Sequence, residues 1–224
     1  MATLNVSYDA YLTNATQGST WAACRDAATS SGINTGTTLS VDSVHVAGRG
    51  PVIHAISRTF LFFDTSGISG TVSSATLKLY GRTNTNNTDF IAIKSRHEAD
   101  PVVADFDTMT GWTTGSADGS GAGDNEGNVY KYSDEIENGD VSTSGYFDVP
   151  LNAQAKYDMA SDDTLGMVLI NFDYDLKDIE PSAGDIHNLV LWSADYSSGS
   201  RIPYIDYTVA VAAADNAIFF GTNF

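Results

Sequence analysis

The sequence has a single cysteine, few basic residues and no long apolar run. Cys24 has no second cysteine to pair with, so an internal disulfide is excluded. Only 11 Lys and Arg stand beside 28 Asp and Glu, and the net charge is −17. Nucleic-acid binding depends on Lys and Arg that replace phosphate counterions, so this balance argues against it, and against anionic membranes too. No stretch approaches the roughly 18 apolar residues of a membrane-spanning helix.

The motifs of common enzymes are missing as well. The sequence contains no Gly-Lys pair, which excludes a P-loop, and no G-x-S-x-G elbow. The histidines are scattered and form no i, i+2 or i, i+4 pair, so they do not predict a transition-metal site. They are His45, His54, His97 and His187. Cys24 has no histidine near it in the sequence and is expected to be a buried thiol. We therefore predict that the protein is not an enzyme and has no cofactor.

The beginning of the chain, MATLNVSYDAY, lacks the basic and apolar regions of a secretory signal. We therefore expect synthesis and folding in a reducing cytoplasm. The charge is unevenly distributed: residues 1–96 hold seven basic and five acidic residues, whereas residues 97–224 hold four and 23. This pattern predicts an acidic, soluble surface over the second half.

Several segments alternate apolar and polar residues or form short apolar runs, as β-strands do. The expected strands are 4–12, 39–47, 54–64, 72–82, 89–97, 145–151, 165–173, 189–195 and 202–211. Gly, Ser, Thr, Asn and Asp are frequent between them and favour turns. Helical signal is limited to 150–160 and to a short turn within 19–31. The sequence predicts an all-β, antiparallel, jelly-roll-like β-sandwich with one short helix.

Residues 100–144 are predicted to be a long acidic insertion rich in Gly and Asp, with aromatics that pack part of it against the sandwich. We expect one domain over 1–211, which includes this insertion, and an apolar tail over 212–224. The acidic motifs DFD (105–107), DNE (124–126) and DYDLKD (173–178) offer oxygen ligands for a structural calcium ion. The alternative is a solvated acidic surface.

The run RTFLFFD (58–64) combines one arginine with a continuous apolar stretch. Its phenylalanines are expected in the core, in a strand buried on both faces. Arg58 then requires a partner, and Asp26 or Asp64 are the candidates. The following Asp64–Gly67 segment has the composition of a turn in which side-chain oxygens accept backbone N–H groups.

Three segments together carry a resemblance to a known family. They are STWAACRDAATSSGIN (19–34), SRTFLFFDTSGISGTVSSATLKLYG (57–81) and SRIPYIDYTV (200–209). In this order they resemble the DNRLRE-type β-sandwich family, which is similar to carbohydrate-binding modules. Members of that family occur as accessory domains of secreted proteins and as structural proteins of tailed bacteriophages.

The resemblance implies a non-enzymatic virion structural protein, either a capsid decoration or cement protein or a tail or fibre component. Its partners would be other virion proteins and further copies of itself, as a homo-oligomer such as a trimer. The alternative is a carbohydrate- or receptor-binding module that uses aromatic side chains. The candidate glycan contacts are Trp112, Tyr130, Tyr132 and Tyr196. Trp21 and Trp192 are expected in the core instead.

The chain finishes with DNAIFFGTNF (215–224), after the last expected strand. Four apolar residues of this tail are candidates for a partner interface: Ile218, Phe219, Phe220 and Phe224. The tail is expected either to cover a sheet edge of its own domain or to dock on another subunit.

Overall fold

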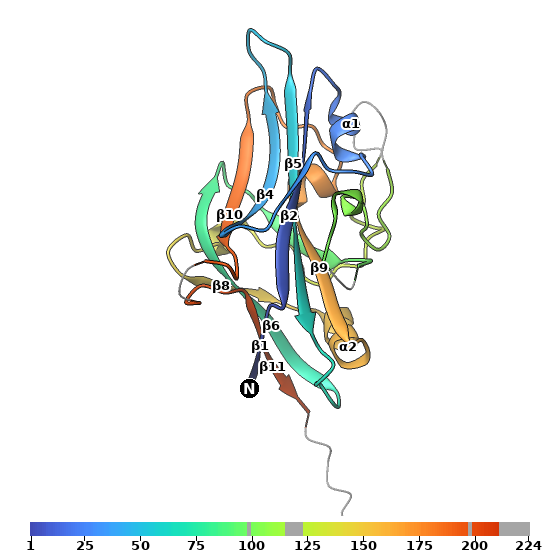
Figure 1. Cartoon of the computed structure of the whole chain (residues 1–224), viewed down its shortest axis with the longest axis vertical. Helices are drawn as coiled ribbons and strands as arrows, with labels where there is room; N and C mark the ends of the chain where they lie inside the picture. Colours follow the sequence, from blue (N-terminus) through green and yellow to red (C-terminus); the bar gives the residue numbers. More distant parts are fainter. Residues whose placement is uncertain (98–99, 115–122, 197–198, 211–224) are drawn as a thin grey trace, which may run out of the picture.

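The computed structural model describes residues 1–97, 100–114, 123–196 and 199–210 (Figure 1). Within these residues the chain forms eleven antiparallel strands, so the predicted all-β sandwich is confirmed. The strands are β1 (Ala2–Asn5), β2 (Tyr8–Gln17), β3 (Gly32–Asn34), β4 (Thr38–Val46), β5 (Ile53–Asp64), β6 (Val72–Thr85), β7 (Phe90–Lys94), β8 (Tyr146–Pro150), β9 (Thr164–Asn171), β10 (Ile186–Trp192) and β11 (Tyr204–Val209).

Two sheets, A and B, share the long strand β6. Sheet A contains β1, β11, the first part of β6 and β8. Sheet B contains β3, β2, β5, β4 and β10, with β9 and β7 continuing from the second half of β5. β6 pairs with β10 through Gly81–Thr85 and thereby connects the two sheets.

The single strand expected over 4–12 is two strands. β1 pairs with β11 in sheet A, whereas β2 pairs with β5 in sheet B. Between them the chain crosses from one sheet to the other, where the Val6 N–H donates to Pro203 O and the Ser7 N–H to Phe62 O. The sequence alternates without interruption here, although Leu4 packs in the core between the two sheets and Leu12 in the core on the outer face of sheet B.

The first core lies between the two sheets. β6 shows how the alternation builds it: Leu77 and Leu79 are fully buried, while Thr76, Lys78 and Tyr80 on the opposite face are half-buried. Each fully buried aliphatic or aromatic side chain stabilises the fold by about 1.5–3 kcal/mol relative to its exposed state. Sheet B contributes Leu39, Val41, Leu61, Phe63 and Leu169 to the same core.

A second core covers the outer face of sheet B. β5 supplies Phe60 and Phe62 to it, whereas Leu61 and Phe63 of the same strand face the first core. The predicted burial of this strand on both faces is therefore confirmed. The covering layer comes from α1, from the insertion and from the segment after β9, which lie together on the right of Figure 1.

Much of the described insertion packs against sheet B. Phe106, Met109 and Trp112 are buried in the second core, and bridges join Ser95 to Met109 and Phe90 to Ile136 along the β7 edge. The insertion thus covers a face of sheet B and extends its β7 edge.

Helices are short and begin at polar caps. In α2 (Ala153–Ser161), the Asn152 side chain accepts the Ala155 N–H at 3.0 Å, so the helix starts after Asn152 and Pro150 ends β8. α1 (Trp21–Arg25) begins after Thr20 in the same manner. Three single turns complete the helical content of the described residues: η1 (Val103–Asp105), η2 (Asn138–Asp140) and η3 (Phe172–Leu176). None of the helices in the described ranges is long and apolar enough to cross a membrane.

Arg58 is fully buried at the base of the second core. Its guanidinium forms a bidentate pair with Asp175, with Nε–Oδ2 at 2.8 Å and Nη2–Oδ1 at 2.7 Å. Two further N–H groups donate to the carbonyl oxygens of Phe106 and Arg25 at 2.8 and 2.9 Å. A buried guanidinium with these four contacts is compensated for the loss of water.

The partner predicted for Arg58 is therefore wrong. Asp26 pairs with the neighbouring Arg25 at 2.6 Å. Asp64 ends β5 and accepts the backbone N–H of Ser66 at 3.1 Å, which confirms the predicted turn chemistry. The true partner was missed because it lies 117 residues away in the sequence, in the segment after β9.

Arg25 extends the same network toward the insertion. It donates to the carbonyl oxygens of Asp175 at 2.7 Å and of Gly123 at 2.9 Å. The Trp112 ring lies against both guanidiniums, 4.5 Å from each. Two buried arginines thus join η3, α1 and the insertion to β5.

We predict that Arg58→Ala lowers the free energy of unfolding by about 3–5 kcal/mol, because it leaves Asp175 buried without its partner. Urea denaturation measures this loss. The control is Lys78→Ala, which removes a surface pair with Asp148 and should cost at most about 1 kcal/mol. If Arg58→Ala does not fold, Asp175→Asn should show a smaller loss of the same sign. Equal losses for the buried and surface variants would contradict the prediction.

Candidate functional site

An arginine–aromatic patch lies on the surface where sheet A meets β10. It consists of Tyr80, Arg82, Tyr146, Trp192, Tyr196, Arg201 and Tyr204. These side chains come from β6, β8, β10, β11 and the loop before β11, so three parts of the sequence meet here: 80–82, 146 and 192–204. Arg82 and Tyr146 are exposed, and the other five are half-buried.

Strand alternation places these residues outside. In β8, Phe147 is buried in the first core, so Tyr146 faces solvent. The same alternation directs Ile205 inward and Tyr204 outward in β11. The patch therefore lies on the outer face of sheet A, opposite the face that packs in the first core.

Arg201 contacts three aromatic rings of the patch. Its guanidinium carbon lies 4.7 Å from the Tyr80 ring centre and 5.2 Å from that of Trp192. It also lies 5.0 Å from the Tyr196 ring. Arg82 approaches Trp192 at 5.0 Å, and the Trp192 and Tyr196 rings are 3.9 Å apart. These cation–π contacts hold both the charges and the rings in place.

Three tyrosines of the patch, Tyr80, Tyr146 and Tyr204, pack against one another. The Tyr146 ring is edge-on to Tyr80 and to Tyr204, with ring centres 5.1 Å apart in each pair. Its hydroxyl donates toward the carbonyl oxygens of Ser200 and Ile202, at 3.3 and 3.1 Å. Tyr146 thereby fixes the loop that carries Arg201.

Asp9 holds the beginning of the loop between β10 and β11 through a hydrogen bond. It is buried on β2, and its Oδ2 accepts the Ala194 N–H at 2.7 Å, between Trp192 and Tyr196. Burial raises the pKa of Asp9 to about 6, and the nearby charge of Asp195 adds to the increase, while the Ala194 hydrogen bond opposes it.

Of the four residues expected to contact a glycan, Tyr196 belongs to the patch. Trp112 and Tyr132 are buried, because the insertion that carries them packs as a core layer, so neither offers a ring face at the surface. Tyr130 is 52% exposed but belongs to no cluster of aromatic rings among the described residues.

Trp21 is buried as expected, but the core position expected for Trp192 is wrong. In β10, Leu189 and Leu191 point into the core, so alternation directs Trp192 to the opposite face. This signal was available in the sequence, and the apolar character of LVLW concealed it.

The predicted interface residues Ile218, Phe219, Phe220 and Phe224 lie outside the described residues. The described chain ends just after β11, where the Ala210 N–H donates to Thr71 O at 2.8 Å. A groove of about 600 Å³ begins at this point, lined by Thr71, Val72, Tyr157 and neighbouring residues of α2. Docking of the tail stays a prediction.

The acidic motifs considered for calcium are largely engaged in other contacts. Asp105 binds His97 at 2.6 Å, and Asp175 binds Arg58. Asp173 lies near Asp89 and Glu135, with one oxygen of each within 4.8 Å of the others. Carboxylates group in this manner on many acidic surfaces without an ion, so calcium stays a prediction.

Cys24 is poorly suited to act as a nucleophile. It is fully buried, its Sγ donates to Asn14 O at 3.2 Å, and burial raises the pKa of the thiol to about 11. This state agrees with the buried thiol expected from the sequence.

Neither the family models nor the curated proteins compared with this chain give a match. The resemblance to the DNRLRE-type family therefore stays a proposal that rests on the sequence segments and is compatible with the sandwich fold.

We predict that the stability of the protein falls as the pH rises from about 4 to about 6, in part because of Asp9. The native state holds this proton to a higher pH than the unfolded chain, so ionisation destabilises the fold. One pKa unit corresponds to about 1.4 kcal/mol, so the cost above the folded pKa is at most about 3 kcal/mol. Asp9→Asn keeps an acceptor for Ala194 and removes this cost.

Denaturation at pH 4 and pH 7 should therefore show that Asp9→Asn gains stability relative to the wild type at the higher pH. Asp206→Asn, at a half-buried position of β11, is the control. An equal difference between Asp9→Asn and the wild type at both pH values would contradict the prediction.

Proposed function

We propose that this chain is a non-enzymatic structural protein of a tailed-phage virion, which attaches to neighbouring virion proteins through the arginine–aromatic patch. The patch is the observation that carries the proposal. Trp, Tyr and Arg are the residues that most often dominate the energy of protein–protein contacts. Here they are held in fixed positions by strands and by mutual stacking.

The charges of the patch favour a protein partner. Among the described residues, neither Arg82 nor Arg201 has a carboxylate within 4 Å, although the chain carries 28 acidic residues. Two guanidiniums ordered by aromatic rings are therefore available to carboxylates of another protein. An acidic face of a second copy is one such surface, so the patch also supports the proposed homo-oligomer.

The arrangement of the rings also separates a protein contact from a sugar platform. Stacking of a sugar requires an open ring face, whereas Arg201 lies over Tyr80, Trp192 and Tyr196. A protein partner can use the edges of the rings and the guanidinium donors at the same time. In a virion with many copies, modest contacts of this kind add up to stable attachment.

Proteomics of purified particles from a phage that carries this gene tests the location. The proposal expects peptides of this chain in the particles at a fixed ratio to the major capsid protein. Their absence from intact particles would refute a virion function.

We predict that Trp192→Ala combined with Arg201→Ala lowers the occupancy of the protein on such particles at least tenfold, because the centre of the contact is removed. Quantitative mass spectrometry of the particles measures the occupancy. Tyr130→Ala is the matched control, since this tyrosine is 52% exposed and lies outside both the patch and the groove beside α2. Equal occupancy of both variants would show that another surface attaches the protein.

A glycan-binding module is the second candidate. It is favoured by Tyr146, which is 36% exposed and has no arginine over its ring among the described contacts. A glycan array with the wild type and Tyr146→Ala separates the two functions. Binding that depends on Tyr146 would favour the module, and no binding at high protein concentration favours the structural protein.

A further inference from the structure

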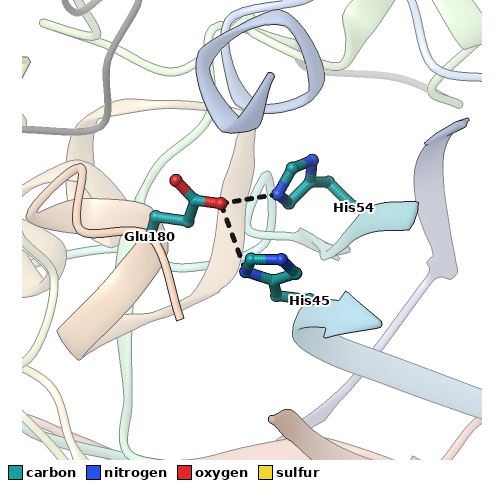
Figure 2. A group of neighbouring side chains, drawn as sticks. All are labelled: His45, His54 and Glu180. Carbon is teal, nitrogen blue, oxygen red and sulfur yellow. Dashed lines mark hydrogen bonds and ion pairs between the residues drawn. The ribbon is translucent and has the colours of Figure 1, made fainter. Parts of the chain in front are cut away.

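His45, His54 and Glu180 form a compact cluster at the end of sheet B that is distant from the patch in the fold. His45 of β4 and His54 of β5 are directly opposite in the hairpin register, and their ring centres are 4.7 Å apart. Glu180, from the segment before β10, extends one carboxylate oxygen toward both rings (Figure 2). Its Oε1 lies 2.8 Å from His54 Nε2 and 3.2 Å from His45 Nδ1.

We propose that these three side chains bind a divalent transition-metal ion of the zinc type. Imidazole nitrogens and a carboxylate oxygen are ordinary zinc ligands, at about 2.0–2.2 Å from the ion. In a tetrahedral site such bonds place the ligand atoms roughly 3.3–3.5 Å apart. Here one donor atom from each residue lies within 4.8 Å of the other two, so small side-chain movements form the site.

The hydrogen bonds of His54 direct one ring nitrogen toward the ion. His54 is 3% exposed, and its Nδ1 lies 3.0 Å from Ser19 O. A carbonyl oxygen can only accept, so Nδ1 carries a proton and, in the neutral ring, the lone pair of Nε2 faces Glu180. A backbone carbonyl that fixes the second nitrogen is the usual support of a metal-binding histidine.

The facing atoms of His54 and Glu180 must share a proton or a metal ion. Both Nε2 of neutral His54 and the Glu180 carboxylate are acceptors, yet they are only 2.8 Å apart. Either a proton or a metal ion satisfies this arrangement. His45 Nδ1 also lies 2.9 Å from Pro181 O, so this nitrogen carries a proton in the structure. To bind the ion, His45 gives up this contact and the proton moves to Nε2, which leaves the lone pair on Nδ1.

The cluster borders a cavity of about 390 Å³, which leaves space for a further ligand such as water. Its wall includes Ser19, Trp21 and Val52 together with the three proposed ligands. The Ser19 hydroxyl oxygen is buried and lacks a hydrogen-bond partner among the described residues. An ion at this place would connect the β4–β5 hairpin to the segment before β10 through side chains, in addition to the backbone hydrogen bonds of His45 with Gly184 and Asp185.

Calorimetric titration of the untagged, chelator-treated protein with zinc chloride tests the proposal. We expect one zinc ion per chain and an increase in the melting temperature of the zinc-loaded protein. His54→Ala should weaken binding at least tenfold, and Glu180→Gln, at a partly exposed position, should do so without loss of the fold. Cobalt in place of zinc should give the visible absorption of a tetrahedral nitrogen–oxygen site.

The matched control is His187→Ala, which removes a histidine whose ring packs against Tyr174 and leaves the cluster intact. This variant should bind zinc as the wild type does. The proposal is overturned if the wild type takes up no zinc, which would show that a proton alone joins the cluster. It is also overturned if Glu180→Gln and His187→Ala bind zinc with equal affinity.

Discussion

The buried pair between Arg58 and Asp175 is the contact on which the second core depends. A guanidinium inside an apolar layer is tolerated only when its charge and most of its donors are compensated, and Asp175 with the carbonyl oxygens of Phe106 and Arg25 accepts four hydrogen bonds from it. The same contacts fix η3, α1 and the insertion against β5. Sheet B is therefore covered on both faces, and the acidic insertion becomes part of the domain.

This covering also determines which surfaces are left for partners. The insertion occupies the outer face of sheet B, and its buried Trp112 cannot reach another molecule. The outer face of sheet A has no such layer among the described residues, and the arginine–aromatic patch lies there. In a chain with a net charge of −17, two stacked arginines that have no carboxylate within 4 Å in the described ranges support this face as the proposed attachment surface.

Most of the fold was predictable, because strand alternation is a local property of the sequence. Leu77 and Leu79 identify the inner face of β6, and the same rule identifies Tyr80 as an outer residue. The rule also identifies Trp192 as an outer residue, although its apolar neighbours suggested the core. The expected strands 39–47 and 54–64 bring His45 and His54 to the same end of a hairpin, but only the observed register places them directly opposite each other.

The sequence by itself determined most of the strands, the two-sided burial of β5, the short helix and the acidic character of the protein. Each depends on neighbours within a few residues. Only the tertiary structure decided that Arg58 binds Asp175 and that Glu180 joins the two histidines, because these partners are more than a hundred residues apart. The sequence around a charged side chain does not show which of the many carboxylates it will contact. The folding of the chain determines this, because it brings residues that are distant in sequence together.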